Sequence, residues 1–193
     1  MINHLISLKR PHAIGILSAA IIITFISFGM TVNGQRREHL TSQEIELVRE
    51  FQEIDRRMEI FVRAVERRLL AIEGTANLDR DGLKKLEKER DKWGELPFEP
   101  RPQLLSDIDK ILDEAISKIE DVAERDSKSE LFPAAVYVLA DGAAGFIPRL
   151  ESLTGKVADA REAALINSAV AHCRDIVQAS SQVERPVKGK KKN

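Results

Sequence analysis

Apolar side chains recur every three or four residues along most of this chain, which is the spacing of amphipathic α-helices. The longest stripe falls within residues 41–72 and consists of Leu47, Phe51, Ile54, Met58, Phe61, Val65, Leu69 and Ile72. Thr41 or Ser42 can cap the first turn, and Gly74 is a natural stop. The pattern predicts one long helix with a continuous buried face.

Three more segments show the same periodicity. A short and mostly polar helix is predicted over residues 79–93, and a longer one over 103–126. A third, over 155–181, has apolar positions on a face wide enough for two neighbours. Residues 94–102 contain three prolines and predict an extended connector between helices.

Residues 131–150 form the most apolar stretch after the N-terminal region. Gly142, Gly145 and Pro148 within this stretch predict a kink or a break in its helix. Asp141 lies near the middle of the stretch, which argues against a membrane span.

Composition agrees with an all-helical fold, because charged residues make up 32% of the chain and aromatic residues only 5%. We predict an all-α chain that forms an antiparallel helical bundle of about four main helices plus one short helix, over residues 35–182. The single cysteine, Cys173, cannot form an intramolecular disulfide and is expected to be a buried, inert thiol.

The N-terminal region has an uncharged apolar run over residues 13–30, preceded by Lys9 and Arg10. One interpretation is a signal peptide over 1–34, cleaved before Gln35. The other is a signal anchor that crosses a membrane through residues 13–32. Both interpretations place residues 35–193 outside the cytoplasm, in the periplasm, secreted or anchored to the membrane.

The C-terminal segment 183–193 has no apolar periodicity and is predicted to be a disordered basic tail. Residues 35–184 carry 23 basic and 31 acidic residues, so the tail and the domain have opposite charge. The tail lysines either contact an anionic envelope surface or fold back on the domain's acidic face; they are Lys188, Lys190, Lys191 and Lys192. Outside the cytoplasm, nucleic acid is not an expected partner.

A metal site is one interpretation of the segment that begins at Asn77. Asn77, Asp79 and Asp81 have the spacing of the first three oxygen ligands of a helix–loop–helix calcium site. Lysines occupy the ninth and twelfth positions, at Lys85 and Lys88, where a calcium loop needs oxygen ligands. The pattern therefore favours a turn in which Asp79 or Asp81 caps the next helix.

Met58 and His172 are the residues that could bind a metal or haem inside a bundle. The chain has neither a Cys-x-x-Cys-His nor a Glu-x-x-His motif, and a single histidine on an apolar helix is typical of a core or rim position. No cofactor is therefore expected.

Asp141 is a candidate buried acid, which would need a partner such as Arg149, Arg161 or Arg174. The alternative is a solvent-facing position beside Gly142.

The sequence contains no catalytic constellation, so we do not expect an enzyme. The pattern favours an exported, non-enzymatic binding or scaffold module of the cell envelope that acts through helix surfaces. Its partner would be a protein, an envelope component or a second copy of the chain. The alternative is a carrier of a small ligand, metal or haem in the bundle interior.

Overall fold

The computed structural model describes residues 38–126 and 128–186, and every regular element within these ranges is helical, as predicted. The predicted export segment and the four tail lysines lie outside these ranges. The α-helices are α1 (Ser42–Glu50), α2 (Ile54–Glu73), α3 (Arg80–Trp93), α4 (Arg101–Asp126), α5 (Leu131–Leu153) and α6 (Ala160–Ser180). Short 3-10 turns follow α2 and α5, at Thr75–Asn77 and Thr154–Lys156.

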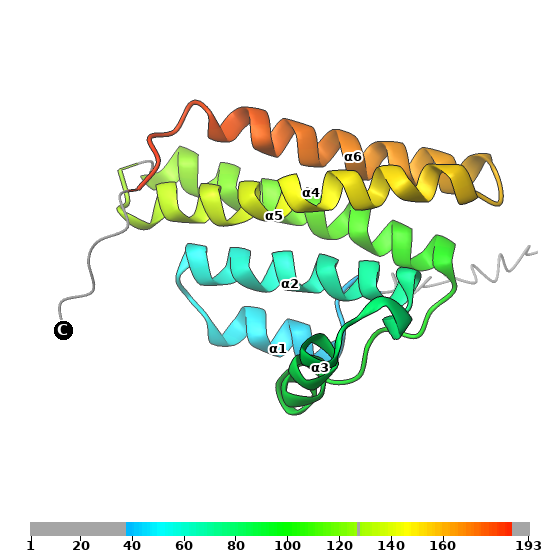
Figure 1. Ribbon diagram of the computed structural model, residues 1–193. Coiled ribbons are helices and arrows are strands. Elements are labelled where there is room, and N and C mark those ends of the chain that lie inside the picture. Colours follow the sequence, from blue (N-terminus) through cyan, green and yellow to red (C-terminus); the bar gives the residue numbers. More distant parts are fainter. Residues whose placement is uncertain (1–37, 127, 187–193) are drawn as a thin grey trace, which may run out of the picture. The chain divides into compact units, whose positions relative to one another are not determined.

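The four long helices α2, α4, α5 and α6 pack against one another (Figure 1). Helix α2 lies against α4 and α5, and α6 lies against the same two helices. Successive long helices run in opposite directions, so the neighbours α2 and α5 run the same way. An ion pair joins the C-terminal ends of these two helices, with Arg149 Nη2 lying 2.7 Å from Glu73 Oε2.

The core lies between these helices and is mainly aliphatic. The stripe predicted for residues 41–72 is buried at most of its positions, and Met58, Phe61, Val65 and Leu69 are at most 1% exposed. Its partners from α4, α5 and α6 include Ile108, Ile111, Leu139, Leu150 and Ile166. Helical periodicity therefore identified the faces that pack together.

The prediction of one continuous first helix is wrong, because the chain leaves helical geometry at Phe51 and forms two helices. The break allows Leu47 of α1 to join a small apolar cluster with Ile60 of α2 and Trp93 of α3. In an unbroken helix, residues 47 and 60 would lie about 20 Å apart, given a rise of about 1.5 Å per residue. Tertiary contact thus overrides local helix propensity at this point.

The break predicted in the apolar stretch is also absent, since α5 is continuous and holds Pro148 in its interior. Gly142 has a packing role here. A Cβ added at this position would lie 2.7 Å from Val62 Cγ2, so the missing side chain lets α5 approach α2 closely.

One described helical segment, Leu131–Lys156, is long and apolar enough to span a membrane by length and composition. Core helices of soluble proteins also meet these two criteria. In the structure, one face of α5 packs against α2 and α6 and buries Ala135, Leu139, Ala143 and Leu150.

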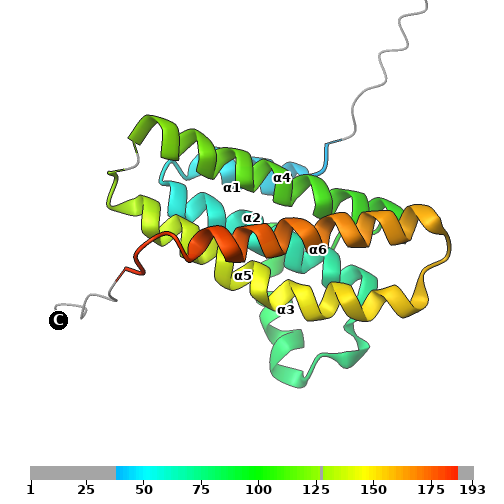
Figure 2. The ribbon, with the colours of Figure 1, turned by 90° about the horizontal axis from the view of Figure 1, so that it is seen from above.

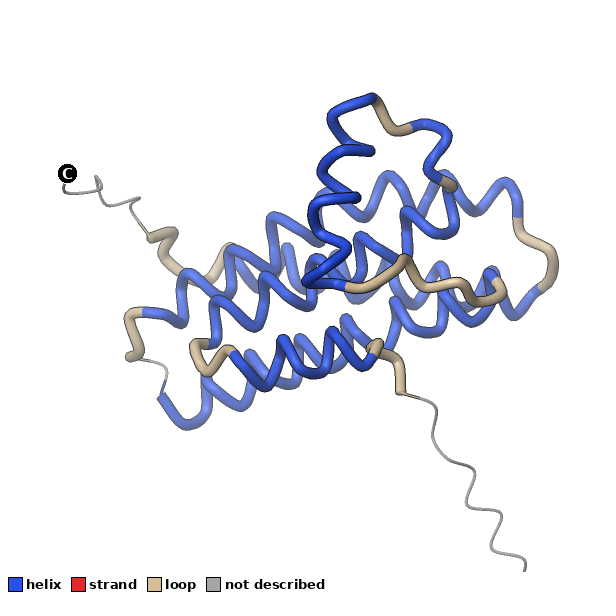
Figure 3. Tube along the Cα trace, turned by 90° about the horizontal axis from the view of Figure 1, so that it is seen from below, coloured by secondary structure: helices blue, strands red, loops and turns tan. Residues whose placement is uncertain are grey.

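Helix α3 lies to one side of the long helices, and the extended connector returns from it to α4 (Figures 2 and 3). As predicted, Asp79 caps α3, and the helix ends at Trp93 before Gly94. Gly94 has φ +70°, a conformation that glycine adopts without strain.

Candidate functional site

The segment predicted as a possible calcium loop forms a helix cap. The Asp79 carboxylate accepts a hydrogen bond from the Gly82 N–H at 2.7 Å, and Asp81 lies in the exposed first turn of α3. Asn77 lies in the 3-10 turn just before them. No group of three or more His, Cys, Asp and Glu side chains that could hold a metal occurs among the described residues.

The two haem candidates lie in different surroundings. Met58 is completely buried in the apolar core. His172 is partly exposed on α6, and its Nε2 lies 3.4 Å from Asp109 Oδ1 of α4. Asp109 was not among the candidate residues, because it is distant from His172 in sequence.

Asp141 is not the buried acid considered from the sequence, since 66% of its side chain is exposed. Its partner is Arg185, whose Nη2 lies 2.6 Å from both carboxylate oxygens. The Arg185 guanidinium also lies 4.7 Å from the centre of the Tyr137 ring, and the Tyr137 hydroxyl donates to the Val183 carbonyl at 2.9 Å.

These contacts correct the predicted start of the disordered tail. Residues 183–186 are held against α5 by side chains that the periodicity of the sequence does not mark. The chain therefore folds back on an acidic residue of the domain at Arg185, whereas the four lysines of the tail lie beyond the described residues.

The most deeply buried charges were missed from the sequence. Glu44 of α1 and Arg68 of α2 are 0% and 1% exposed, and both carboxylate oxygens accept hydrogen bonds from Arg68, at 2.9 and 2.8 Å. Glu44 also accepts from the Thr41 N–H, closing a capping box at the start of α1. One carboxylate thus joins a helix cap to a buried ion pair.

Arg67 extends this cluster toward α3. Its Nε lies 3.4 Å from Glu44 Oε1, and its Nη2 donates to the carbonyls of Trp93, Gly94 and Glu95. Burial lowers the pKa of the Arg67 guanidinium, and the nearby Glu44 carboxylate opposes this effect. The cluster therefore connects α1, α2 and the end of α3, a structural role that requires neither ligand nor catalysis.

A second set of contacts connects the residues just before α1 to the long helices. His39 Nε2 is 2.7 Å from Glu114 Oε2 of α4, and Arg68 donates to the His39 carbonyl. The hydrogen bond with His39 lowers the pKa of Glu114, against the opposing effect of burial. The entry to α1 is thereby tied to both α2 and α4.

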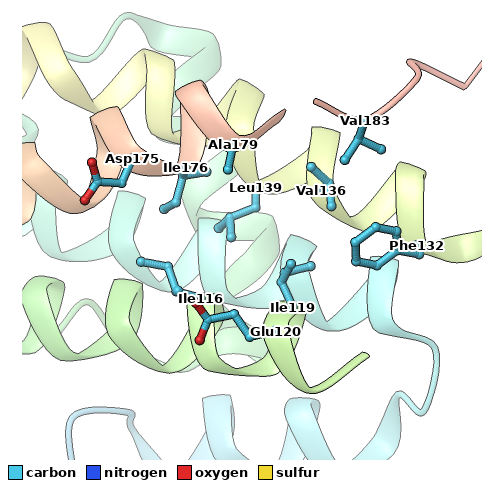
Figure 4. A pocket seen from close by; sticks show the side chains of 10 residues that line it. All are labelled: Ile116, Ile119, Glu120, Phe132, Val136, Leu139, Asp175, Ile176, Ala179 and Val183. Carbon is cyan, nitrogen blue, oxygen red and sulfur yellow. The ribbon is translucent and has the colours of Figure 1, made fainter. Parts of the chain in front are cut away.

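A cavity of about 220 Å³ opens between the C-terminal halves of α4 and α6 and the N-terminal half of α5 (Figure 4). Two acidic residues line it, Glu120 of α4 and Asp175 of α6. The rest of its wall is apolar and consists of Ile116, Ile119, Phe132, Val136, Leu139, Ile176, Ala179 and Val183. Met58, Asp141 and His172 are not part of this wall.

An uncovered apolar surface lies on α3 and the connector that follows it. Phe98 is fully exposed and Leu83 is 46% exposed. Together with Leu86 and Leu96, they line a shallow cleft that also contains Glu87, Arg90 and Glu95. Phe98 lies in the non-helical connector between Pro97 and Pro100, and both prolines disfavour helix there.

Comparison of this chain with family models, with curated proteins and with solved structures found no match.

Proposed function

We propose that this chain is an exported, non-enzymatic binding module, built on a bundle of long helices, that works outside the cytoplasm or at the membrane surface. Its partner is a protein, another envelope component or a second copy of the chain. The N-terminal apolar run is the basis for the location, and the exposed surface of α3 is the basis for binding.

The observation that carries this proposal is the exposure of Phe98 beside Leu83. A large aromatic side chain contributes much of the energy of an interface when a partner covers it. An exposed apolar patch with charged residues at its edge is typical of an interaction site. The patch here is bordered by Glu87, Arg90 and Glu95.

Site-specific photo-cross-linking in an exporting bacterial host tests this surface. A photoreactive amino acid at position 98 is expected to give a discrete cross-linked product, and one at the exposed position Lys128 is the control. The substitution Leu83→Glu should abolish the product without changing the circular dichroism spectrum. The same products at both positions, or none at position 98, would contradict the proposal.

The location is tested separately by fractionating the host and measuring the intact mass. A chain that begins at Gln35 and lies outside the cytoplasm is expected if the signal peptide is cleaved. A full-length chain in the membrane, with Lys128 accessible to an external protease, is expected if the segment is an anchor. Recovery of the full-length chain from the cytoplasm would refute export.

A second candidate function is a carrier of a small ligand, and the cavity between α4, α5 and α6 favours it. The site would then lie at one end of the long helices, and not around Met58 and His172, which the sequence analysis considered for a metal or haem. Binding of small apolar compounds to the purified chain, measured by titration calorimetry, tests this candidate. Loss of binding in an Ala179→Phe variant would locate it.

A further inference from the structure

The cavity between α4, α5 and α6 has a wall that selects for apolar groups. Seen in Figure 4, the apolar side chains of the three helices converge on one space, and Val183 borders it from the returning chain. An apolar cavity of about 150 Å³ holds one benzene molecule. A volume of about 220 Å³ therefore suits a phenyl ring with a short alkyl chain.

The wall of the cavity also selects by charge. Glu120 and Asp175, from two different helices, are the charged residues that line it, and no basic side chain lines it. Among the described residues, neither carboxylate has an ion-pair or hydrogen-bond partner. A cation in the cavity would be attracted by the negative charge of both residues, whereas an anion would be repelled by it.

The segment that follows α6 contributes Val183 to the wall of the cavity. Val183 is held in place by the hydrogen bond from Tyr137, and Arg185 is paired with Asp141. Arg185, two residues from Val183, is therefore paired with an acid that does not line the cavity.

We infer that this cavity binds a small molecule with an apolar body and one positive charge, such as an arylalkyl amine. This inference rests on the carrier function proposed above and adds the chemical class of the ligand. The apolar body occupies the space between the helices, and the ammonium group lies at the edge near Glu120 and Asp175. Because both carboxylates are exposed, each contributes a modest, salt-sensitive attraction.

Titration calorimetry with three compounds of matched size tests the inference on the full chain. 4-Phenylbutylamine is expected to bind about fivefold more tightly than 4-phenylbutanol at low ionic strength. 4-Phenylbutyrate should bind more weakly than the alcohol. The preference for the amine should disappear in about 0.5 M salt, where charges on the surface are screened.

Two double variants and one single variant separate the effect of the charges at the cavity from the effect of its shape. Glu120→Gln with Asp175→Asn should remove the preference for the amine and leave the affinity for the alcohol unchanged. Asp121→Asn with Glu124→Gln removes two acids of α4 that do not line the cavity, and this control should keep the preference. Ala179→Phe should abolish binding of all three compounds.

Other results would overturn the inference in distinct ways. Equal binding of the amine and the alcohol would refute charge selection and leave the carrier function standing. No binding of any compound would refute both. If a chain that ends at Pro186 bound the amine at least tenfold more tightly, the basic tail would be the natural occupant of the cavity. A dimer that the amine dissociates would assign the cavity to a second copy.

Discussion

Single residues with buried charges connect the first two helices to the third. Glu44 accepts hydrogen bonds from the backbone amide of Thr41, the N-cap of α1, and from Arg68 of α2. A buried ion pair contributes little net stability compared with apolar packing, but removing one partner leaves the other charge buried and unpaired. The cluster is therefore sensitive to loss of any one member.

Replacement of Glu44 should be among the most destabilising single substitutions. We expect Glu44→Gln to lower the free energy of unfolding by about 3–5 kcal/mol, because Arg68 would lose its buried counter-ion. Urea denaturation followed by circular dichroism measures the change. The matched control is Glu46→Gln in the same helix, which removes an exposed pair with Arg49 and should cost less than about 1 kcal/mol. Similar losses in both variants would contradict this account.

The pair of His39 and Glu114 should make stability depend on pH. The pKa of Glu114 is lower in the folded chain than its usual value of 4.5, chiefly because His39 hydrogen-bonds to the carboxylate. The pair therefore stabilises the fold above this usual value, and the contribution is lost as pH falls through the lower pKa of the folded state.

We expect Glu114→Gln to lower the urea midpoint at pH 6, and we expect its difference from the wild type to shrink as pH falls to 3. Asp113→Asn, which removes a neighbouring exposed carboxylate, serves as the control and should show a smaller difference at pH 6. If the difference in urea midpoint between Glu114→Gln and the wild type grew as the pH fell, it would contradict this prediction.

At the scale of elements, close packing between α2 and α5 depends on one glycine. A Cβ at Gly142 would lie 2.7 and 2.8 Å from the two γ-carbons of Val62, whereas one at Gly145 would meet no atom within 4 Å. Valine in a helix has essentially one side-chain rotamer, so Val62 cannot turn away. Two glycines of the same helix thus have different roles.

Alanine substitution should therefore have opposite effects at these two glycines. Gly145→Ala should stabilise the chain by up to about 1 kcal/mol through helix propensity. Gly142→Ala should destabilise it by about 1–2 kcal/mol, because overpacking exceeds that gain. Thermal unfolding measures both, and the additional change Val62→Ala should recover part of the loss at position 142. Stabilisation by Gly142→Ala would show that the helices can separate at little cost.

At the scale of the whole molecule, the core contains the single thiol of the chain. Cys173 is completely buried in α6, and burial raises its pKa to about 12. Only the thiolate reacts with alkylating and disulfide reagents. Access to Cys173 therefore requires the long helices to separate.

Labelling of Cys173 should consequently report global unfolding. In native buffer at pH 8, a disulfide reagent is expected to react about a hundredfold or more slowly than in urea. The labelling rate should rise with urea in parallel with the loss of helical signal. Rapid labelling of the native chain would indicate local opening of α6, and it would contradict the packing described here.

Most helices could be predicted from the sequence because the residues that favour and cap each helix lie within it or beside it in the chain. The stripe from Ile54 to Leu69 places apolar groups on one face of α2. Asp79 caps α3 by accepting a hydrogen bond from Gly82, three residues later, without help from distant residues. The all-helical class followed from such patterns. The predicted site residues were less informative, since Asp141 is exposed and paired with Arg185, and Asp79 caps a helix.

The tertiary structure decided those features that depend on contacts between helices distant in the sequence. The break at Phe51 exists because Leu47 packs on Ile60 and Trp93, which no local signal marks. In the sequence, Glu44, Arg67 and Arg68 look like ordinary surface charges, and only the packing of α1, α2 and the end of α3 buries them. The cavity, likewise, is formed by three helices from separate parts of the chain. Periodicity shows which face of a helix is buried, but not which neighbour covers it.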